Sequence, residues 1–95
     1  MSLDLARFGV VMGDLNCLPE DEPIQFLTEI RELTHLVPQG SGWTFNDFDP
    51  DHDGGMIDHI LVTGLVKVRE VFVDRSLVDG RLASDHYPVV ARLLL

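Results

Sequence analysis

The segment MIDHILVTG, residues 56–64, decides how this chain folds. Its apolar residues predict a buried β-strand, which Asp58 and His59 interrupt. Burying a carboxylate is costly unless a partner compensates its charge. We therefore expect Asp58 to be paired, with a histidine as the natural partner. The alternative is a strand with one solvated face that carries Asp58.

Segments on either side of this strand predict an α+β fold. Further strands are predicted at FGVVMGDLN (8–16), which we expect to be buried, at VKVREVFVD (66–74) and at YPVVARLLL (87–95). Asp21 can cap a helix that begins at Glu22–Pro23, and its apolar stripe would contain Phe26, Leu27, Ile30, Leu33 and Leu36. A strand, a helix and then several strands favour layers of α and β structure over a helix bundle.

Composition restricts the class of protein. The 95 residues can form one domain, and 45% of them are hydrophobic, which argues against a disordered chain. The 16 acidic and 7 basic residues give a formal net charge of −9, which argues against a free-standing nucleic-acid binder. An acidic enzyme can still meet phosphate through a bound cation, because clustered carboxylates hold Mg²⁺ or Ca²⁺.

Targeting signals and cysteines give little information on localisation. No stretch of about 18 apolar residues is present, so we expect no membrane span. The first residues lack the basic and apolar regions of a signal peptide. Cys17 is the only cysteine, so an intrachain disulfide is excluded. A cytoplasmic compartment is favoured on these grounds.

The end of the first predicted strand carries Asp14 and Asn16. In an extended segment, residues two apart share a face, so the carboxylate and the carboxamide would point the same way. Asp14 could bind a metal ion or orient a nucleophile, and Asn16 could contact a phosphate oxygen. The alternative is an ordinary junction between strand and turn, where Asp and Asn bond to nearby backbone.

Ser84, Asp85 and His86 stand side by side before the last predicted strand. Adjacent side chains of extended backbone point to opposite faces, so these residues should not form a Ser–His–Asp series. If Asp58 binds one nitrogen of His86, the other nitrogen stays free to act on a substrate. Asp85, facing the other way, could be a metal ligand. The alternative is a solvated loop before Pro88.

An acidic loop, DPDHDG (49–54), matches the opening of a calcium-binding EF-hand loop. The twelfth position is Ile60, where a bidentate Glu is needed, and a predicted strand follows. We therefore interpret it as a solvated loop with weak cation binding at most. Cys17, His35 and His52 are interpreted as structural, and no zinc or P-loop motif is present.

Three short motifs occur in order along the chain: GDLN (13–16) with Pro19, IDHILV (57–62) and SDHYPVV (84–90), with WTF (43–45) ahead of the second. Together they resemble the C-terminal half of the endonuclease/exonuclease/phosphatase superfamily, the DNase I-like enzymes. The resemblance implies part of a four-layer α/β-sandwich, namely one β-sheet layer with a flanking helix, incomplete on its own. Residues 1–95 would be the C-terminal portion of a single domain, with residues 1–8 vector-derived or disordered.

The resemblance also implies a role for each motif residue in metal-dependent phosphoester hydrolysis. His86 would act as general base or as transition-state stabiliser, and Asp58 would orient it. Asp14 would position or deprotonate the attacking water, and Asn16 would bind the scissile phosphate. Asp85 would hold Mg²⁺ or Mn²⁺. The substrate would be a phosphate ester of a small molecule, a lipid headgroup or a nucleic acid, and the net charge of −9 disfavours duplex DNA.

The chain also departs from the family pattern. The N-terminal half of the family supplies a metal-binding Glu, an Asn and a second His, for which we find no candidate here. We therefore expect a fragment whose own activity is absent or very weak. Two other interpretations stay open: a catalytically silent structural module, and a Ca²⁺ module that uses Asp49, Asp51 and Asp53. Exposed strand edges lead us to expect a dimer or larger assembly.

Overall fold

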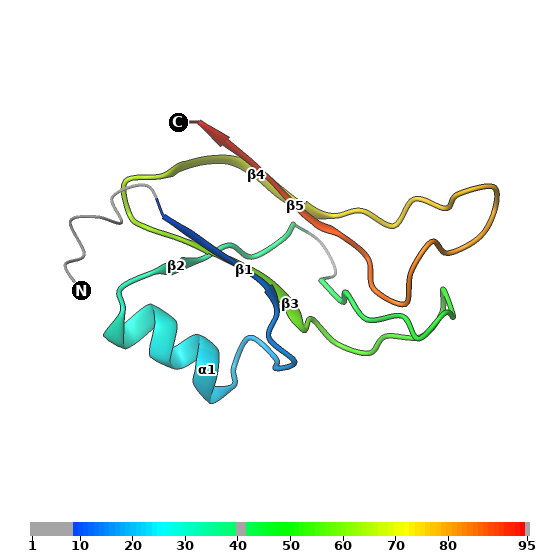
Figure 1. Ribbon diagram of the computed structural model, residues 1–95, viewed down its shortest axis with the longest axis horizontal. Helices are drawn as coiled ribbons and strands as arrows, with labels where there is room; N and C mark the ends of the chain where they lie inside the picture. The colour runs from blue at the N-terminus through cyan, green and yellow to red at the C-terminus, as the bar shows by residue number, and fades with distance from the viewer. Residues whose placement is uncertain (1–8, 40–41, 95) are drawn as a thin grey trace.

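Two small antiparallel sheets and one short helical segment make up the computed structural model, which describes residues 9–39 and 42–94 (Figure 1). The first sheet has the order β1–β3–β2, formed by β1 (Val10–Asp14), β3 (Asp58–Val62) and β2 (Thr34–His35). The second sheet pairs β4 (Lys67–Val73) with β5 (Val89–Leu94). The α+β class is therefore confirmed, although the strands divide between two sheets where one layer was expected. The expectation for residues 1–8 lies outside the described residues.

Strand β3 lies between two hydrophobic cores because its side chains alternate between the faces of the sheet. Ile60 and Val62 pack on one face in a cluster that includes Val71 of β4, with side chains of β5 around it. Leu61, which is 0% exposed, packs on the other face with Ile24 and Cys17. A strand buried on both faces positions its end residues rigidly, and Asp58 begins this strand.

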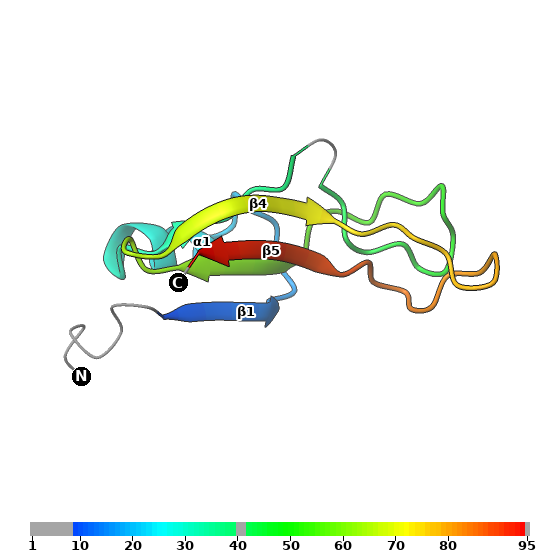
Figure 2. The same ribbon diagram turned by 90° about the horizontal axis from the view of Figure 1, so that it is seen from above.

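Strand β1 is an outer strand rather than the buried strand that its sequence predicted. All five of its residues are exposed, and Met12 is 67% exposed. β1 pairs with β3 along one edge, and within residues 9–39 and 42–94 no strand pairs with its other edge. Figure 2 shows β1 on the outer side of the molecule. The prediction failed because an apolar strand is buried only when neighbours cover both of its faces.

The helix begins where predicted and ends earlier. α1 (Glu22–Gln25) follows Asp21 and continues as a π-helical segment, η2 (Phe26–Ile30). The Asp21 carboxylate accepts the N–H of Leu18 at 2.8 Å and makes no side-chain bond to the helix. No helix in the described part of the chain is long and apolar enough to cross a membrane.

The prediction that the helical stripe extends to Leu36 is wrong. Glu32 adopts a left-handed backbone with φ of 57°, and the chain then forms β2 against β3. The N–H of Leu36 donates to the carbonyl of Ile60 at 2.9 Å. Residues 34–36 therefore pair with β3 instead of continuing the helix. As a result Phe26 and Ile30 are exposed, and Leu36 packs between the sheets.

Candidate functional site

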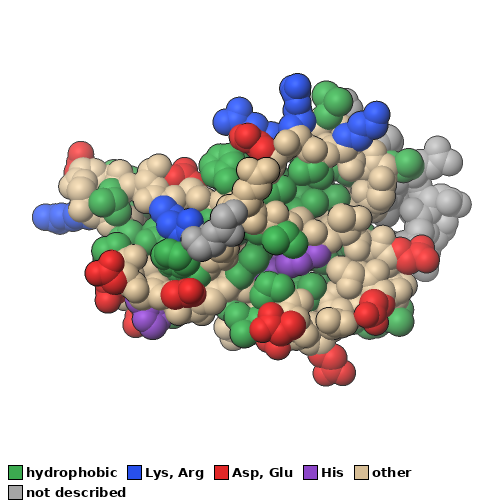
Figure 3. All heavy atoms as spheres, turned by 180° about the vertical axis from the view of Figure 1, so that it is seen from behind, with side chains coloured by type: hydrophobic (Ala, Val, Ile, Leu, Met, Phe, Trp, Pro, Cys, Tyr) green, Lys and Arg blue, Asp and Glu red, His purple; other side chains and the backbone are tan. Residues whose placement is uncertain are grey.

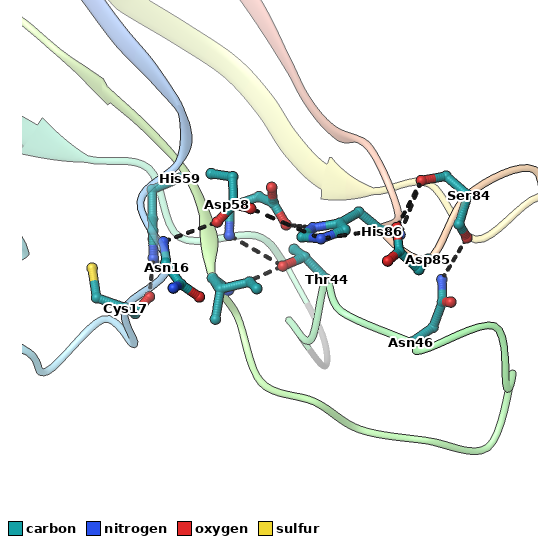
Figure 4. A network of polar contacts seen from close by, with 11 residues as sticks. Asn16, Cys17, Thr44, Asn46, Asp58, His59, Ser84, Asp85 and His86 are labelled. Carbon is teal, nitrogen blue, oxygen red and sulfur yellow. Dashed lines mark hydrogen bonds and ion pairs between the residues drawn. The ribbon is translucent and has the colours of Figure 1, made fainter.

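Asp58, at the start of β3, and His86, shortly before β5, form a close pair (Figure 4). The strand alternation that buries Ile60 between the sheets points Asp58 toward the same side, where His86 precedes β5. Oδ2 of Asp58 lies 2.7 Å from Nδ1 of His86. Because a carboxylate only accepts hydrogen bonds, Nδ1 carries the proton, and Nε2 is the nitrogen that faces outward.

Asp14 joins this pair through the register of the first sheet. In the β1–β3 ladder Asp14 lies directly opposite Asp58. Oδ2 of Asp14 is 3.9 Å from Nε2 of His86, and one ligand atom from each of Asp14, Asp58 and His86 lies within 4.8 Å of the others. Carboxylate oxygens with one imidazole nitrogen are donors that a divalent cation accepts, so this group could hold a metal ion.

Asp85 lies on the same side as His86, contrary to the expectation that it faces the other way. Its Oδ1 is 4.0 Å from Nε2 of His86. The alternation rule fails here because residues 83–85 form a bend rather than an extended strand. The Ser84 hydroxyl accepts the backbone N–H of His86 at 3.1 Å and lies 3.4 Å from Asp85, which is not the order of a Ser–His–Asp series.

Asn16 stands in the turn that follows Asp14. Its backbone is left-handed, with φ of 52°, a conformation that Asn tolerates better than most residues. Its backbone N–H donates to Oδ1 of Asp14 at 2.9 Å, and its side chain is exposed. The turn therefore holds the backbone of Asn16 against the Asp14 carboxylate.

Three carboxylates surround His86 and change its acidity. The hydrogen bond that Nδ1 of His86 donates to Asp58 is the largest cause that raises the pKa of His86, and the charges of Asp58, Asp85 and Asp14 act in the same direction. Partial burial opposes this effect. The raised pKa favours the imidazolium form, which presents an Nε2–H donor.

The charge of Asp58 should make stability depend on pH. A raised pKa in the folded state means that protonated His86 stabilises the fold below its ordinary pKa of 6.5, and that this stability is lost as pH rises through the folded pKa. Asp58→Asn keeps a hydrogen-bond acceptor and removes the charge. Urea unfolding in metal-free buffer should therefore show a wild-type advantage over Asp58→Asn that is largest at acidic pH. An advantage that grows with increasing pH would contradict the assignment.

Two buried polar residues that sequence reasoning did not select hold the backbone of the site. Thr44, 0% exposed, accepts the backbone N–H of Asp58 at 3.2 Å through its hydroxyl. Asn46, also 0% exposed, donates from Nδ2 to the carbonyl of Ser84 at 3.2 Å, and its backbone N–H donates to the carbonyl of Asp85 at 2.8 Å. The signal was a pair of polar residues on either side of Phe45, the last residue of the WTF motif.

A cavity of about 320 Å³ opens beside the pair. Its polar lining residues are Asp58, His59, Ser84 and His86, and its apolar lining contains Met12, Ile60, Tyr87, Pro88 and Val89. A small ligand could therefore meet polar and apolar groups in the same space.

The acidic loop does not form a comparable cluster. Asp49 accepts the N–H of Asp51, and Asp53 accepts the N–H of Gly55, both at 2.9 Å. These are local turn bonds. Across residues 9–39 and 42–94, the group of three or more acids and histidines close enough to share an ion is Asp14, Asp58 and His86.

Comparison with known proteins identifies the family of the chain. A sequence model of the Endonuclease/Exonuclease/phosphatase family matches residues 2–86. No curated protein and no solved structure matches the chain. The family match covers GDLN, IDHILV and the first three residues of SDHYPVV, and it covers most of the chain. The chain therefore belongs to the endonuclease/exonuclease/phosphatase family.

Proposed function

We propose that this chain carries catalytic residues of a divalent-metal-dependent phosphoesterase, which hydrolyses a phosphomonoester or phosphodiester by in-line attack of water. The observation that carries the proposal is the 2.7 Å bond between Asp58 and His86, with Nε2 of His86 facing Asp14 and Asp85. Membership of a family of hydrolytic phosphoesterases and nucleases supports it.

His86 would stabilise the charge that develops on phosphate. Its raised pKa favours an Nε2–H that donates to a phosphate oxygen, so we choose transition-state stabiliser over general base. Asp14 would orient the attacking water and accept its proton. The distance of 3.9 Å between Nε2 of His86 and Oδ2 of Asp14 is too long for a direct hydrogen bond. It is short enough for a single oxygen atom of water or phosphate to contact both groups. Asn16 would donate to a further phosphate oxygen.

Asp85 and Asp14 would hold the Mg²⁺ or Mn²⁺ ion. Carboxylate oxygens are ligands that such an ion accepts: Asp14 belongs to the group of Asp14, Asp58 and His86 whose ligand atoms lie within 4.8 Å of one another, and Oδ1 of Asp85 lies 4.0 Å from Nε2 of His86. When bound, the ion supplies Lewis-acid stabilisation of phosphate charge and offsets the protein's charge of −9. Two carboxylates fill only part of a shell of about six ligands, so we expect weak metal binding and slow turnover.

Removal of a proposed metal ligand should abolish cation binding. We expect the wild-type chain to bind Mn²⁺ weakly, with a Kd of about 10⁻³ M, and we expect Asp85→Ala to lose this binding. Titration of Mn²⁺ followed by water proton relaxation measures it. Asp51→Ala, in the acidic loop, is the matched control and should bind as the wild type does. Loss of binding in Asp51→Ala alone would favour the Ca²⁺ module, and no binding by the wild type would favour the silent module.

The surface favours a small phosphate ester or a lipid headgroup over duplex DNA. Figure 3 shows hydrophobic and acidic side chains over much of one face of the molecule, with Lys and Arg dispersed mostly along its upper part. Duplex DNA is held mainly by many Lys and Arg contacts to phosphate.

Association of copies along the outer edge of β1 stays a prediction.

A further inference from the structure

A second chain of hydrogen bonds lies on the opposite face of β3 from Asp58. His59 is 1% exposed and follows Asp58 in the strand, so its side chain lies on the face of β3 opposite to that of Asp58, the face on which Leu61 packs against Ile24. Nε2 of His59 lies 2.6 Å from the carbonyl oxygen of Cys17, and Nδ1 lies 2.9 Å from Nε2 of His35 in β2. Figure 4 shows His59 beside Cys17 and away from His86.

The partners fix where the protons lie. A carbonyl oxygen only accepts, so Nε2 of His59 carries its hydrogen. In neutral His59, Nδ1 is then an acceptor, and Nε2 of His35 must donate to it. Burial, and then the proximity of His59, lower the pKa of His35 and so disfavour a positive charge on His35. His35 therefore donates a hydrogen bond to His59, and His59 donates one to the carbonyl of Cys17.

The hydrogen bond between His59 and the carbonyl of Cys17 anchors the turn that carries Asn16. Before the turn, the N–H of Leu15 donates to the carbonyl of Ile57 at 3.1 Å, which continues the pairing of β1 with β3. After Asn16, the bond from His59 ties the carbonyl of Cys17 back to β3. Asn16, in its left-handed conformation, lies between these two anchors.

We propose that His59, oriented by His35, is a positioning residue that fixes the turn in which Asn16 stands beside Asp14. His59 would contact neither the substrate nor the metal ion and would act through the Cys17 carbonyl. The importance of Asn16 for phosphate rests on the proposed function, whereas the fixing of the turn does not.

Amide hydrogen exchange tests the anchor without any activity. In His59→Leu, the amide of Asn16 should exchange about tenfold faster than in the wild type, because the turn opens more often once the Cys17 carbonyl has lost its hydrogen bond. Amides of β4 and β5 should be unchanged. His59→Gln can keep a donor and should restore slow exchange. Ile24→Val perturbs the same core without touching the bond and is the matched control.

Two outcomes would overturn the proposal. One is Asn16 exchange in His59→Leu that stays within about twofold of the wild type or speeds up equally in Ile24→Val. The other is a long-range ¹H–¹⁵N spectrum of the wild type in which neutral His59 carries its proton on Nδ1. If His59→Leu does not fold, His35→Phe removes only the orienting partner and should still loosen Asn16 selectively.

A titration with inorganic phosphate and Mg²⁺ separates this proposal from the proposed function. The side-chain amide signal of Asn16 should shift with phosphate, and His59→Leu should weaken the apparent affinity about tenfold while His59→Gln does not. No phosphate response in the wild type, together with selective loosening of the turn in His59→Leu, would refute the role of Asn16 and support the anchor.

Discussion

Leu61→Ala is expected to lower the free energy of unfolding by about 2–5 kcal/mol, the largest stability effect we predict for this chain. Leu61 is 0% exposed and lies in β3, where it packs against Ile24 and Cys17. The truncation removes buried methyl groups and leaves a cavity that the strand cannot close. Because domains are stable by only about 5–15 kcal/mol, a large fraction of the molecules should be unfolded at modest urea concentrations.

An exposed leucine provides the control for this prediction. Leu65 is 58% exposed in the turn between β3 and β4, so Leu65→Ala should change stability by no more than about 0.5 kcal/mol. Urea unfolding followed by far-UV circular dichroism measures both variants. Equal effects of the two substitutions would show that β3 is not buried between two cores.

The central strand and the partner of Asp58 could be predicted from the sequence. The apolar run of 56–64 implied burial, and the cost of an unpaired buried carboxylate required a partner for Asp58. The motifs then pointed to His86. The direct pairing of Asp14 with Asp58 could not be predicted, because strand register depends on long-range contacts that spacing along the chain does not reveal.

The errors have the same physical origin. Leu33 and Leu36 fit a helical stripe, but the pairing of Thr34 and His35 with β3 ended the helix. The direction of Asp85 depends on a bend that Asn46, remote in sequence, holds through the carbonyls of Ser84 and Asp85. The contact of His35 with His59 could not be predicted either, because only the pairing of β2 with β3 brings the two rings together. Local pattern cannot specify contacts that tertiary packing selects.

His86→Ala should have the largest effect on activity. It removes the Nε2–H donor that faces Asp14 and Asp85, and it leaves the Asp58 carboxylate without its partner. Loss of a positioned proton donor or acceptor slows catalysis by about 10²–10⁴-fold. Because turnover by the wild-type chain is expected to be slow, the variant should be indistinguishable from the uncatalysed reaction. Leu65→Ala should retain wild-type turnover, because Leu65 is exposed and is far from His86 in the sequence.

Hydrolysis of an aryl phosphodiester, with and without Mn²⁺, tests the proposed function most directly. For the wild-type chain we predict Mn²⁺-dependent turnover well below the roughly 1–10³ s⁻¹ of ordinary enzymes, abolished by His86→Ala. Turnover that survives His86→Ala or removal of the metal ion would contradict the assignment of the Asp58–His86 pair. An absence of Mn²⁺-dependent turnover in the wild type would contradict catalysis by this chain and would fit either an inactive fragment or the silent module.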